Sequence, residues 1–352
     1  MTRALPLLPL LLLLGCPTAA TDDDDATGYP DIPRYDFEAA APWFECPDAF
    51  EDGTEEVRVF DRQDQYFGAE NLRDIHADVD LPVGDFAQIG LWFELRCPGG
   101  NCDDWDRAGS IQMMVDPGNP DAGMRELARF VTPYDRGMCQ YIDVTPLASV
   151  LQGPQSFTSW IDTWVGPGHA QGDGWVTSMS LVYTPGEPTA SSVIDVWGRR
   201  SITVGEVEPG ANVDSQIEPV TVSIPANARR VRAHLVTTGH SFGNTANCAE
   251  FCSMEHDLFV NGDVHAWEGW RDDCDQNPVS PQAGTWEFPR NGWCPGAIAV
   301  GKVMNVLESV TPGEDAVLDF DILRSNGSEY DNTSPVDLLP YTFVSLKLYV
   351  EE

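Results

Sequence analysis

Lysine is nearly absent from this chain of 352 residues, which contains only Lys302 and Lys347. Lysine and arginine together number 20 against 56 aspartates and glutamates, so the net charge is −36. Neutralising nucleic-acid phosphates requires clustered basic side chains, and this composition therefore excludes a general nucleic-acid binder. It also disfavours adsorption of a basic face to anionic lipid. Histidine is scarce as well, with six residues and no His-His or His-x-His pair.

Long apolar runs are scarce too. Residues 5–14 are apolar but too short to cross a bilayer as a helix, and they follow Arg3, so residues 1–15 are expected to be a signal peptide. The run ends in Leu-Leu-Gly-Cys at Cys16, which resembles the lipobox of bacterial lipoproteins. The resemblance implies lipid on Cys16, membrane attachment through it, and a location in the bacterial cell envelope, at the outer membrane or in the periplasm. Residues 16–28 are expected to be an acidic tether. An ordinary secretory signal, and a calcium site at residues 22–25, are the alternatives.

Short strands dominate the predicted secondary structure. Hydrophobic and polar residues alternate in residues 89–95, 231–235, 318–322 and 344–351, a pattern that predicts one buried and one solvated face on each strand. Turn clusters rich in Pro and Gly separate these runs, and helical periodicity is rare. The sequence therefore predicts an all-β protein of antiparallel sandwiches or jelly rolls. A Pro-rich stretch at 184–189 suggests a boundary between domains at 29–187 and 188–352.

Nine cysteines are present, and eight remain when Cys16 is set aside. An even number in an exported chain favours disulfides, although spacing alone does not fix their connectivity. The remaining cysteines fall into two closely spaced pairs, one wider pair and two singletons: Cys97 and Cys102, Cys248 and Cys252, Cys274 and Cys294, and finally Cys46 and Cys139. A metal site formed by Cys248, Cys252 and His256 is the competing interpretation.

Three segments combine charged side chains, tryptophan and cysteine. The first, residues 97–107, contains Asp106 beside Arg107, and an arginine keeps a neighbouring carboxylate ionised and oriented. The second, residues 238–252, places Glu250 between two cysteines. The third, residues 289–296, contains Arg290 and Trp293. Such acids can activate water, and tryptophan rings can stack on sugars. An ion pair capping a loop, and tryptophans packed in the core, are the structural alternatives.

In the same order, CDDWDR (102–107), NCAEFC (247–252) and RNGWCPG (290–296) resemble the peptide-N-glycosidase F family, with further similarity at 129–134 and 161–164. The resemblance implies two eight-stranded antiparallel jelly rolls packed side by side, with the site in the cleft between them. It implies three disulfides, Cys97–Cys102, Cys248–Cys252 and Cys274–Cys294. It also implies the catalytic carboxylates Asp106, Glu250 and Asp162, and the substrate-binding residues Trp105, Arg107, Trp164, Arg290 and Trp293.

The activity that the resemblance implies is hydrolysis of the amide that joins asparagine to N-acetylglucosamine in an N-glycopeptide or glycoprotein. It would use water and placed carboxylates, with no metal or other cofactor, and the protein is expected to be a monomer. Three positions depart from the family pattern: Asp162 is shorter than the expected glutamate, Phe251 replaces tryptophan and Pro289 replaces aspartate. They motivate the alternative of a catalytically impaired carbohydrate-binding lipoprotein. A copper monooxygenase of similar architecture is a third hypothesis, which the unclustered histidines disfavour.

Overall fold

The computed structural model describes residues 46, 50–188, 191–203, 213–241, 249–324 and 340–352. All of its strands lie within the compact unit Ile32–Glu352. Among these residues, no helix has the length and hydropathy needed to span a membrane. The predicted signal peptide (1–15), the tether (16–28) and Cys16 fall outside the described residues, so the expectations about them stay predictions.

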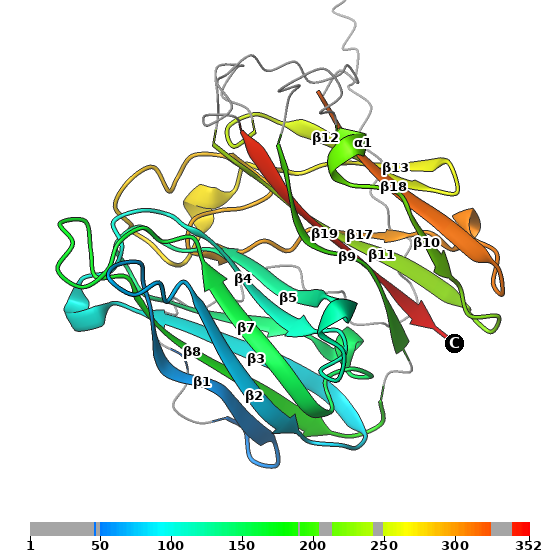
Figure 1. Ribbon diagram of the computed structural model, residues 1–352, viewed down its shortest axis with the longest axis horizontal. Coiled ribbons are helices and arrows are strands. Elements are labelled where there is room, and N and C mark those ends of the chain that lie inside the picture. Colours follow the sequence, from blue (N-terminus) through cyan, green and yellow to red (C-terminus); the bar gives the residue numbers. More distant parts are fainter. Residues whose placement is uncertain (1–45, 47–49, 189–190, 204–212, 242–248, 325–339) are drawn as a thin grey trace, which may run out of the picture. The chain divides into compact units, whose positions relative to one another are not determined.

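Two sheets form the first sandwich, shown in blue to green in Figure 1. One sheet has the order β1-β8-β3-β6 and the other β16-β5-β4-β7-β2, and every pairing is antiparallel. The strands are β1 (Glu55–Gln65), β2 (Asp74–Leu81), β3 (Phe86–Arg96), β4 (Ala108–Met114), β5 (Met124–Val131), β6 (Met138–Asp143), β7 (Gly153–Ile161), β8 (Trp175–Pro185) and β16 (Ala297–Ile298). The short β16 comes from much later in the chain and extends the sheet beside β5.

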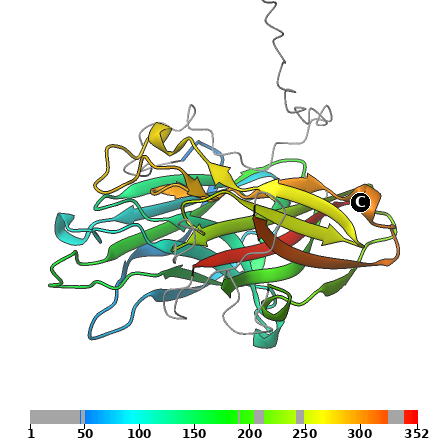
Figure 2. The ribbon, with the colours of Figure 1, turned by 90° about the horizontal axis from the view of Figure 1, so that it is seen from above.

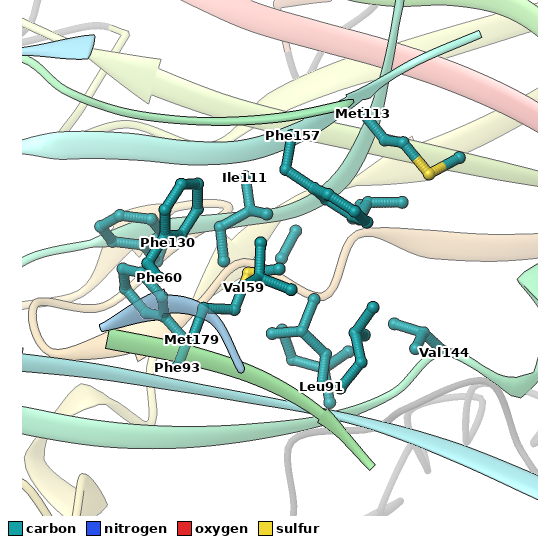
Figure 3. Packing of buried hydrophobic residues seen from close by; sticks show 14 of the residues in the cluster. Val59, Phe60, Leu91, Phe93, Ile111, Met113, Phe130, Val144, Phe157 and Met179 are labelled. Atoms are coloured by element: carbon teal, nitrogen blue, oxygen red, sulfur yellow. The ribbon is translucent and has the colours of Figure 1, made fainter. Parts of the chain in front are cut away.

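The core of the first sandwich is aromatic and aliphatic. Phe60 and Phe93 from one sheet pack together with Ile111, Phe130 and Phe157 from the facing sheet, and all five are fully buried (Figure 3). Burial of each such side chain contributes roughly 1.5–3 kcal/mol. The predicted buried face of residues 89–95 is confirmed, because their four alternating apolar side chains are all inaccessible to solvent. The predicted solvated face is not, because Glu94 between them is only 6% exposed.

The second sandwich pairs the sheets β10-β18-β12-β13 and β17-β11-β19-β9, again antiparallel throughout. Strand β19, drawn in red, runs between β11 and β9 (Figure 2). The elements are β9 (Ser191–Thr203), α1 (Val213–Gln216), β10 (Val220–Ser223), β11 (Arg230–His240), β12 (Met254–Val260), β13 (Asp263–Glu268), β17 (Lys302–Asn305), β18 (Asp315–Arg324) and β19 (Tyr341–Glu351). A small separate sheet joins β14 (Trp270–Arg271) to β15 (Arg290–Asn291).

Strand β19 corrects one prediction. Its apolar residues are buried as expected, but Ser345 and Lys347, predicted to face water, are 2% and 4% exposed. They contact β5 of the first sandwich: the hydroxyl of Ser345 donates to the carboxylate of Glu126, and Lys347 Nζ donates to the Glu126 carbonyl oxygen (2.8 Å). The polar face of this strand is therefore an internal contact, and alternation alone does not reveal it because it cannot show that a second sandwich covers that face.

Arg129 reinforces this polar contact between the sandwiches. It lies on β5, pairs with Glu126, and donates from Nη1 to the carbonyl oxygens of Val236 (3.2 Å) and Phe343 (2.6 Å). Paired and hydrogen-bonded charges are the form in which buried ions are tolerated. The antiparallel all-β sandwich architecture predicted from the sequence is confirmed, whereas the domain bounds 29–187 and 188–352 stay predictions.

Candidate functional site

Asp103 organises the loop that carries Asp106. Its side chain is fully buried, and its carboxylate accepts hydrogen bonds from the backbone N–H of Trp105 (3.0 Å) and the hydroxyl of Thr163 (2.7 Å). Arg107 donates to it from Nε (2.7 Å) and Nη2 (3.1 Å). Because these contacts hold the backbone of Trp105 and the side chain of Arg107, on either side of Asp106, the direction of that carboxylate is set before any ligand binds. The guanidinium of Arg107 is itself engaged by Asp103.

Arg290, in the third motif, contacts one acid of the first motif and one acid of the second. Its side chain is fully buried at the start of β15 and donates from Nη1 to the carbonyl oxygens of Thr285 (2.9 Å) and Phe288 (2.7 Å). Its Nη2 lies 3.6 Å from Asp106 Oδ2, and its Nε lies 3.3 Å from Glu250 Oε1. One buried cation therefore brings together two carboxylates that are 144 residues apart in the sequence, as their numbers 106 and 250 show.

The carboxylate of Asp106 is partly exposed, and one of its oxygens makes no hydrogen bond within the described part of the chain. Burial raises the pKa of its carboxyl, an effect that Arg290, a hydrogen bond from Tyr134 and the charge of Arg107 partly offset. Its Oδ2 atom is buried and makes no hydrogen bond with any of the described residues. A buried carboxylate oxygen without a partner is uncommon and calls for an explanation. A carboxylate of raised pKa with a free lone pair is a stronger base than an exposed aspartate.

Glu250 is held by the backbone that precedes it. The N–H of Ser241 donates to Glu250 Oε2 (3.2 Å), and the N–H of Glu250 donates to the Ser241 carbonyl oxygen (2.9 Å). Burial, together with the negative charge of Asp106, raises the pKa of Glu250 to about 7, although Arg290 opposes the change. Two neighbouring acids with raised pKa values are typical of sites that transfer protons.

Asp162 lies at one side of this pair. Its carboxylate is 3.7 Å from Nη1 of Arg73, and burial raises its pKa while Arg73 and Arg107 lower it. The pKa of Tyr341 is raised by burial and then by the negative charges of both Asp162 and Glu250. Asp162 also lies close to the loop that carries Asp106, because its backbone N–H donates to the carbonyl oxygen of Ala108 (2.9 Å).

The three predicted tryptophans differ in accessibility. Trp105 and Trp164 are 48% and 53% exposed, as rings that stack on a ligand must be. Trp293 is only 2% exposed, and its indole N–H donates to the Gly239 carbonyl oxygen (2.7 Å). Its ring stacks on His240 at 5.4 Å. Trp293 therefore has the core-packing role that was the alternative for the tryptophans, and the proposed stacking face on it is not accessible.

Arg290 is likewise enclosed. Its guanidinium lies 5.0 Å from the ring centre of Phe251 and 4.9 Å from that of Trp293. Cation–π contacts of this kind stabilise a desolvated arginine. The predicted direct contact between Arg290 and a sugar is not supported by this burial, and Arg290 instead positions the two carboxylates.

Disulfides close the loops around the site. Cys97–Cys102 and Cys274–Cys294 form as the family resemblance implies, and Cys46 pairs with Cys139. The predicted pairing of Cys248 with Cys252 involves Cys248, which lies outside the described residues.

Histidines near the site are buried rather than clustered. His234, His240 and His256 all have pKa values lowered by burial, so they are neutral core residues at neutral pH. Among the described residues, the one grouping of metal-ligand types is Asp273 with the sulfurs of Cys274 and Cys294, which are already joined in a disulfide. The described residues thus offer no histidine cluster for copper.

Three residues important to the geometry were not predicted as site residues. Asp103 lies inside the first motif, Tyr134 ends the 129–134 block, and Arg73 precedes β2. The hydroxyl of Tyr134 accepts a hydrogen bond from Arg290 Nη2 (3.2 Å). The matching blocks that contain Asp103 and Tyr134 could have indicated these two residues. No pattern in the sequence distinguishes Arg73.

Comparisons with known proteins find similarity in both sequence and fold. Residues 210–319 match the family described as "Peptide-N-glycosidase F, C terminal". The chain is 26% identical over 301 residues to peptide-N(4)-(N-acetyl-beta-D-glucosaminyl)asparagine amidase F of Elizabethkingia miricola, covering 80% of this chain and 81% of that protein.

Solved structures extend the similarity to the fold. The structure of PNGase F, a glycosylasparaginase from Flavobacterium meningosepticum, superposes with a TM-score of 0.72 at 20% identity, covering 86% of this chain and 96% of that one. PNGF-II superposes with a TM-score of 0.66 at 17% identity, covering 85% of this chain and 66% of that one. The jelly-roll fold is therefore shared. The sequence match over most of both chains, the C-terminal family model and the fold agree, and the chain is therefore similar to peptide-N-glycosidase F in sequence and in fold.

Proposed function

We propose that this protein is a glycoamidase that hydrolyses the amide between asparagine and N-acetylglucosamine in N-linked glycopeptides. The observation that carries the proposal is the buried contact of Arg290 with both Asp106 and Glu250. Amide hydrolysis requires a base to activate water and an acid to protonate the leaving nitrogen. Two carboxyls of raised pKa beside one cation can supply both groups. Sequence similarity to an enzyme named for this reaction supports the assignment.

Asp106 is the proposed base. Its Oδ2, which makes no hydrogen bond with the described residues, accepts a proton from water, and the water oxygen attacks the side-chain amide carbon of the glycosylated asparagine. The tetrahedral intermediate collapses as the bond from carbon to nitrogen breaks. The products are aspartate in the peptide and a glycosylamine. Burial strengthens Asp106 as a base because it raises the pKa of the carboxyl.

Glu250 is the proposed acid. With a pKa of about 7, a substantial fraction of Glu250 carries a proton at neutral pH and can give it to the leaving nitrogen. Arg290 does not reach solvent, so its contribution is to hold the two carboxyls in position and to limit their mutual repulsion. We therefore regard it as a positioning residue.

The exposed rings of Trp105 and Trp164 are the proposed sugar contacts, with Asp162 beside Trp164 as a hydrogen-bond acceptor. Pyranose rings present C–H groups on one face, which pack on an indole, while their hydroxyls bind carboxylates. In this proposal the sugars lie along the first sandwich, and the reacting amide lies where Asp106 of the first sandwich meets Glu250 of the second.

The test uses the full chain and a denatured N-glycoprotein. Wild-type protein should increase the mobility of the glycoprotein on a gel and convert the glycosylated asparagine to aspartate, measured by mass spectrometry of the peptide. Asp106→Asn should abolish both changes. Asp104→Asn, at an exposed acid two residues away, is the matched control and should behave as wild type. Full activity in Asp106→Asn, or none in the wild type, would exclude the proposal.

Carbohydrate binding without cleavage is the second candidate. It is favoured by the engagement of Arg107 with Asp103, because this contact occupies a guanidinium that the family resemblance implies for substrate binding. Binding of a glycopeptide that is recovered with unchanged mass would support this candidate. Turnover that depends on Asp106 would exclude it.

We further propose that the protein is a monomer anchored to the cell envelope by lipid on Cys16. The Leu-Leu-Gly-Cys sequence at 13–16 supports the anchor. A fatty-acid analogue fed to expressing cells should label the wild type and not Cys16→Ser. Equal labelling of the two proteins would contradict the anchor, and light scattering tests the monomer.

A further inference from the structure

Arg73 lies beside the most exposed ring of the site. Its guanidinium carbon is 4.6 Å from the ring centre of Trp164 and 4.7 Å from that of Phe67. The two rings are themselves 5.2 Å apart. The arginine is therefore stacked against an aromatic pair, and Trp164 retains 53% exposure. Stacking of this kind is specific to the planar guanidinium and would be lost with lysine.

Arg73 is also fixed at its backbone and at Nε. Its carbonyl oxygen accepts a hydrogen bond from the amide nitrogen of Gln65 (3.0 Å), a fully buried side chain. Its Nε donates to Asn71 Oδ1 (2.9 Å). A side chain anchored at both ends is pre-organised and loses little entropy when it binds a ligand.

The terminal nitrogens of Arg73 make no hydrogen bond with the described residues. Nη1 lies 3.7 Å from Asp162 Oδ1, which is beyond hydrogen-bond length. Within the described part of the chain, neither Nη1 nor Nη2 makes a hydrogen bond, and the Arg73 side chain is 20% exposed. Nitrogen donors of Arg73 and carboxylate acceptors of Asp162 thus stand next to each other beside an exposed ring.

A donor beside an acceptor is complementary to an amide group, which presents a carbonyl oxygen and an N–H. Among sugar substituents, the acetamido group has this pair, whereas a hydroxyl is smaller and presents both functions on one atom.

We propose that Arg73 and Asp162 recognise the acetamido group of an N-acetylhexosamine that is stacked on Trp164, with Arg73 donating to the carbonyl oxygen and Asp162 accepting from the N–H. This inference rests on the proposed function, since it concerns the sugar side of the same site. It makes Arg73 a residue that determines specificity for acetylated amino sugars.

The experiment measures binding of two free disaccharides by calorimetry, N,N′-diacetylchitobiose and cellobiose. They share the same ring skeleton and differ in their acetamido groups. The wild type should bind the acetylated disaccharide at least about tenfold more tightly, because a hydrogen bond to a charged group is at stake. Arg73→Met should lose most of this preference while affinity for cellobiose changes little. Arg58→Met, at a partly exposed arginine paired with Glu56, should retain the preference.

The outcomes separate this inference from the proposed function. A preference that persists in both Arg73→Met and Arg73→Gln would overturn the role of Arg73, as would a wild type that binds the two disaccharides equally. Cleavage of an N-glycopeptide, measured in parallel, decides the proposed function by itself. Thermal unfolding confirms that each variant is folded, and Arg73→Gln replaces Arg73→Met if the latter is not.

Discussion

Glu250 gives the sharpest prediction for stability. Its pKa is about 7 in the folded protein, against an ordinary value of 4.5. Between these values the folded state retains a proton that the unfolded state has released. The free energy of unfolding therefore decreases as pH rises through this window. A tenfold difference in proton affinity corresponds to about 1.4 kcal/mol, so the total effect of this one group is about 3 kcal/mol.

Glu250→Gln removes the titration but keeps the shape and the capacity for hydrogen bonds. The variant should match the wild type only at pH values well below 4.5, where Glu250 is neutral in both the folded and the unfolded state. Above pH 7 it should be more stable by about 3 kcal/mol, because no charge has to be held in the buried site. Functional sites commonly contain such buried charged groups, which lower the stability of the folded protein.

Urea unfolding at pH values from about 5 to about 8 measures the difference between the two proteins. Every other acid of the chain titrates in both, so its contribution largely cancels. Glu287→Gln, at an exposed glutamate in the loop before Arg290, controls for the loss of one negative charge. A stability difference that does not change with pH, or a Glu250→Gln protein that is less stable at pH 8, would refute the reasoning.

Three further predictions concern the frame of the site. Arg290→Met should lower the free energy of unfolding by about 3–5 kcal/mol, since two carboxylates lose a buried partner, and unchanged urea unfolding would contradict this. Tyr134→Phe removes one acceptor from Arg290 and should cost about 1 kcal/mol by the same assay; a gain in stability would contradict it. Replacing both cysteines of Cys46–Cys139, which closes a loop of 93 residues, should cost about 4–5 kcal/mol, against about 2 for the five-residue Cys97–Cys102 loop; the reverse order would contradict the loop-entropy argument.

Much of the fold could be predicted from local patterns. Leu318, Phe320 and Ile322 alternate with polar residues and are buried as expected, because one face of an antiparallel strand contacts the core. The same rule fails for Ser345 and Lys347, which are polar but buried. Alternation shows only that the two faces of a strand differ in polarity, and it does not show that a second sandwich covers the polar face.

The site was less accessible to sequence reasoning. Nothing in the spacing of Asp106 and Glu250 indicates that they meet, and their association was predicted only through the family resemblance. The buried support of Asp103 and the stacking of Arg73 depend on long-range packing. Trp293 is buried and Trp105 is exposed, although both tryptophans occur in matching motifs. The motifs could not predict this difference, because exposure depends on how the loops pack in the folded protein.

Hydrolysis in heavy-oxygen water tests the central claim most directly. If water activated by Asp106 attacks the amide carbon, the wild type should release the glycan and place one heavy oxygen in the side chain of the new aspartate. Asp106→Asn should slow this incorporation by roughly 10²–10⁴-fold. Mass spectrometry of the peptide reads the result. Heavy oxygen on the released sugar with an unchanged asparagine, or incorporation that does not depend on Asp106, would contradict the account.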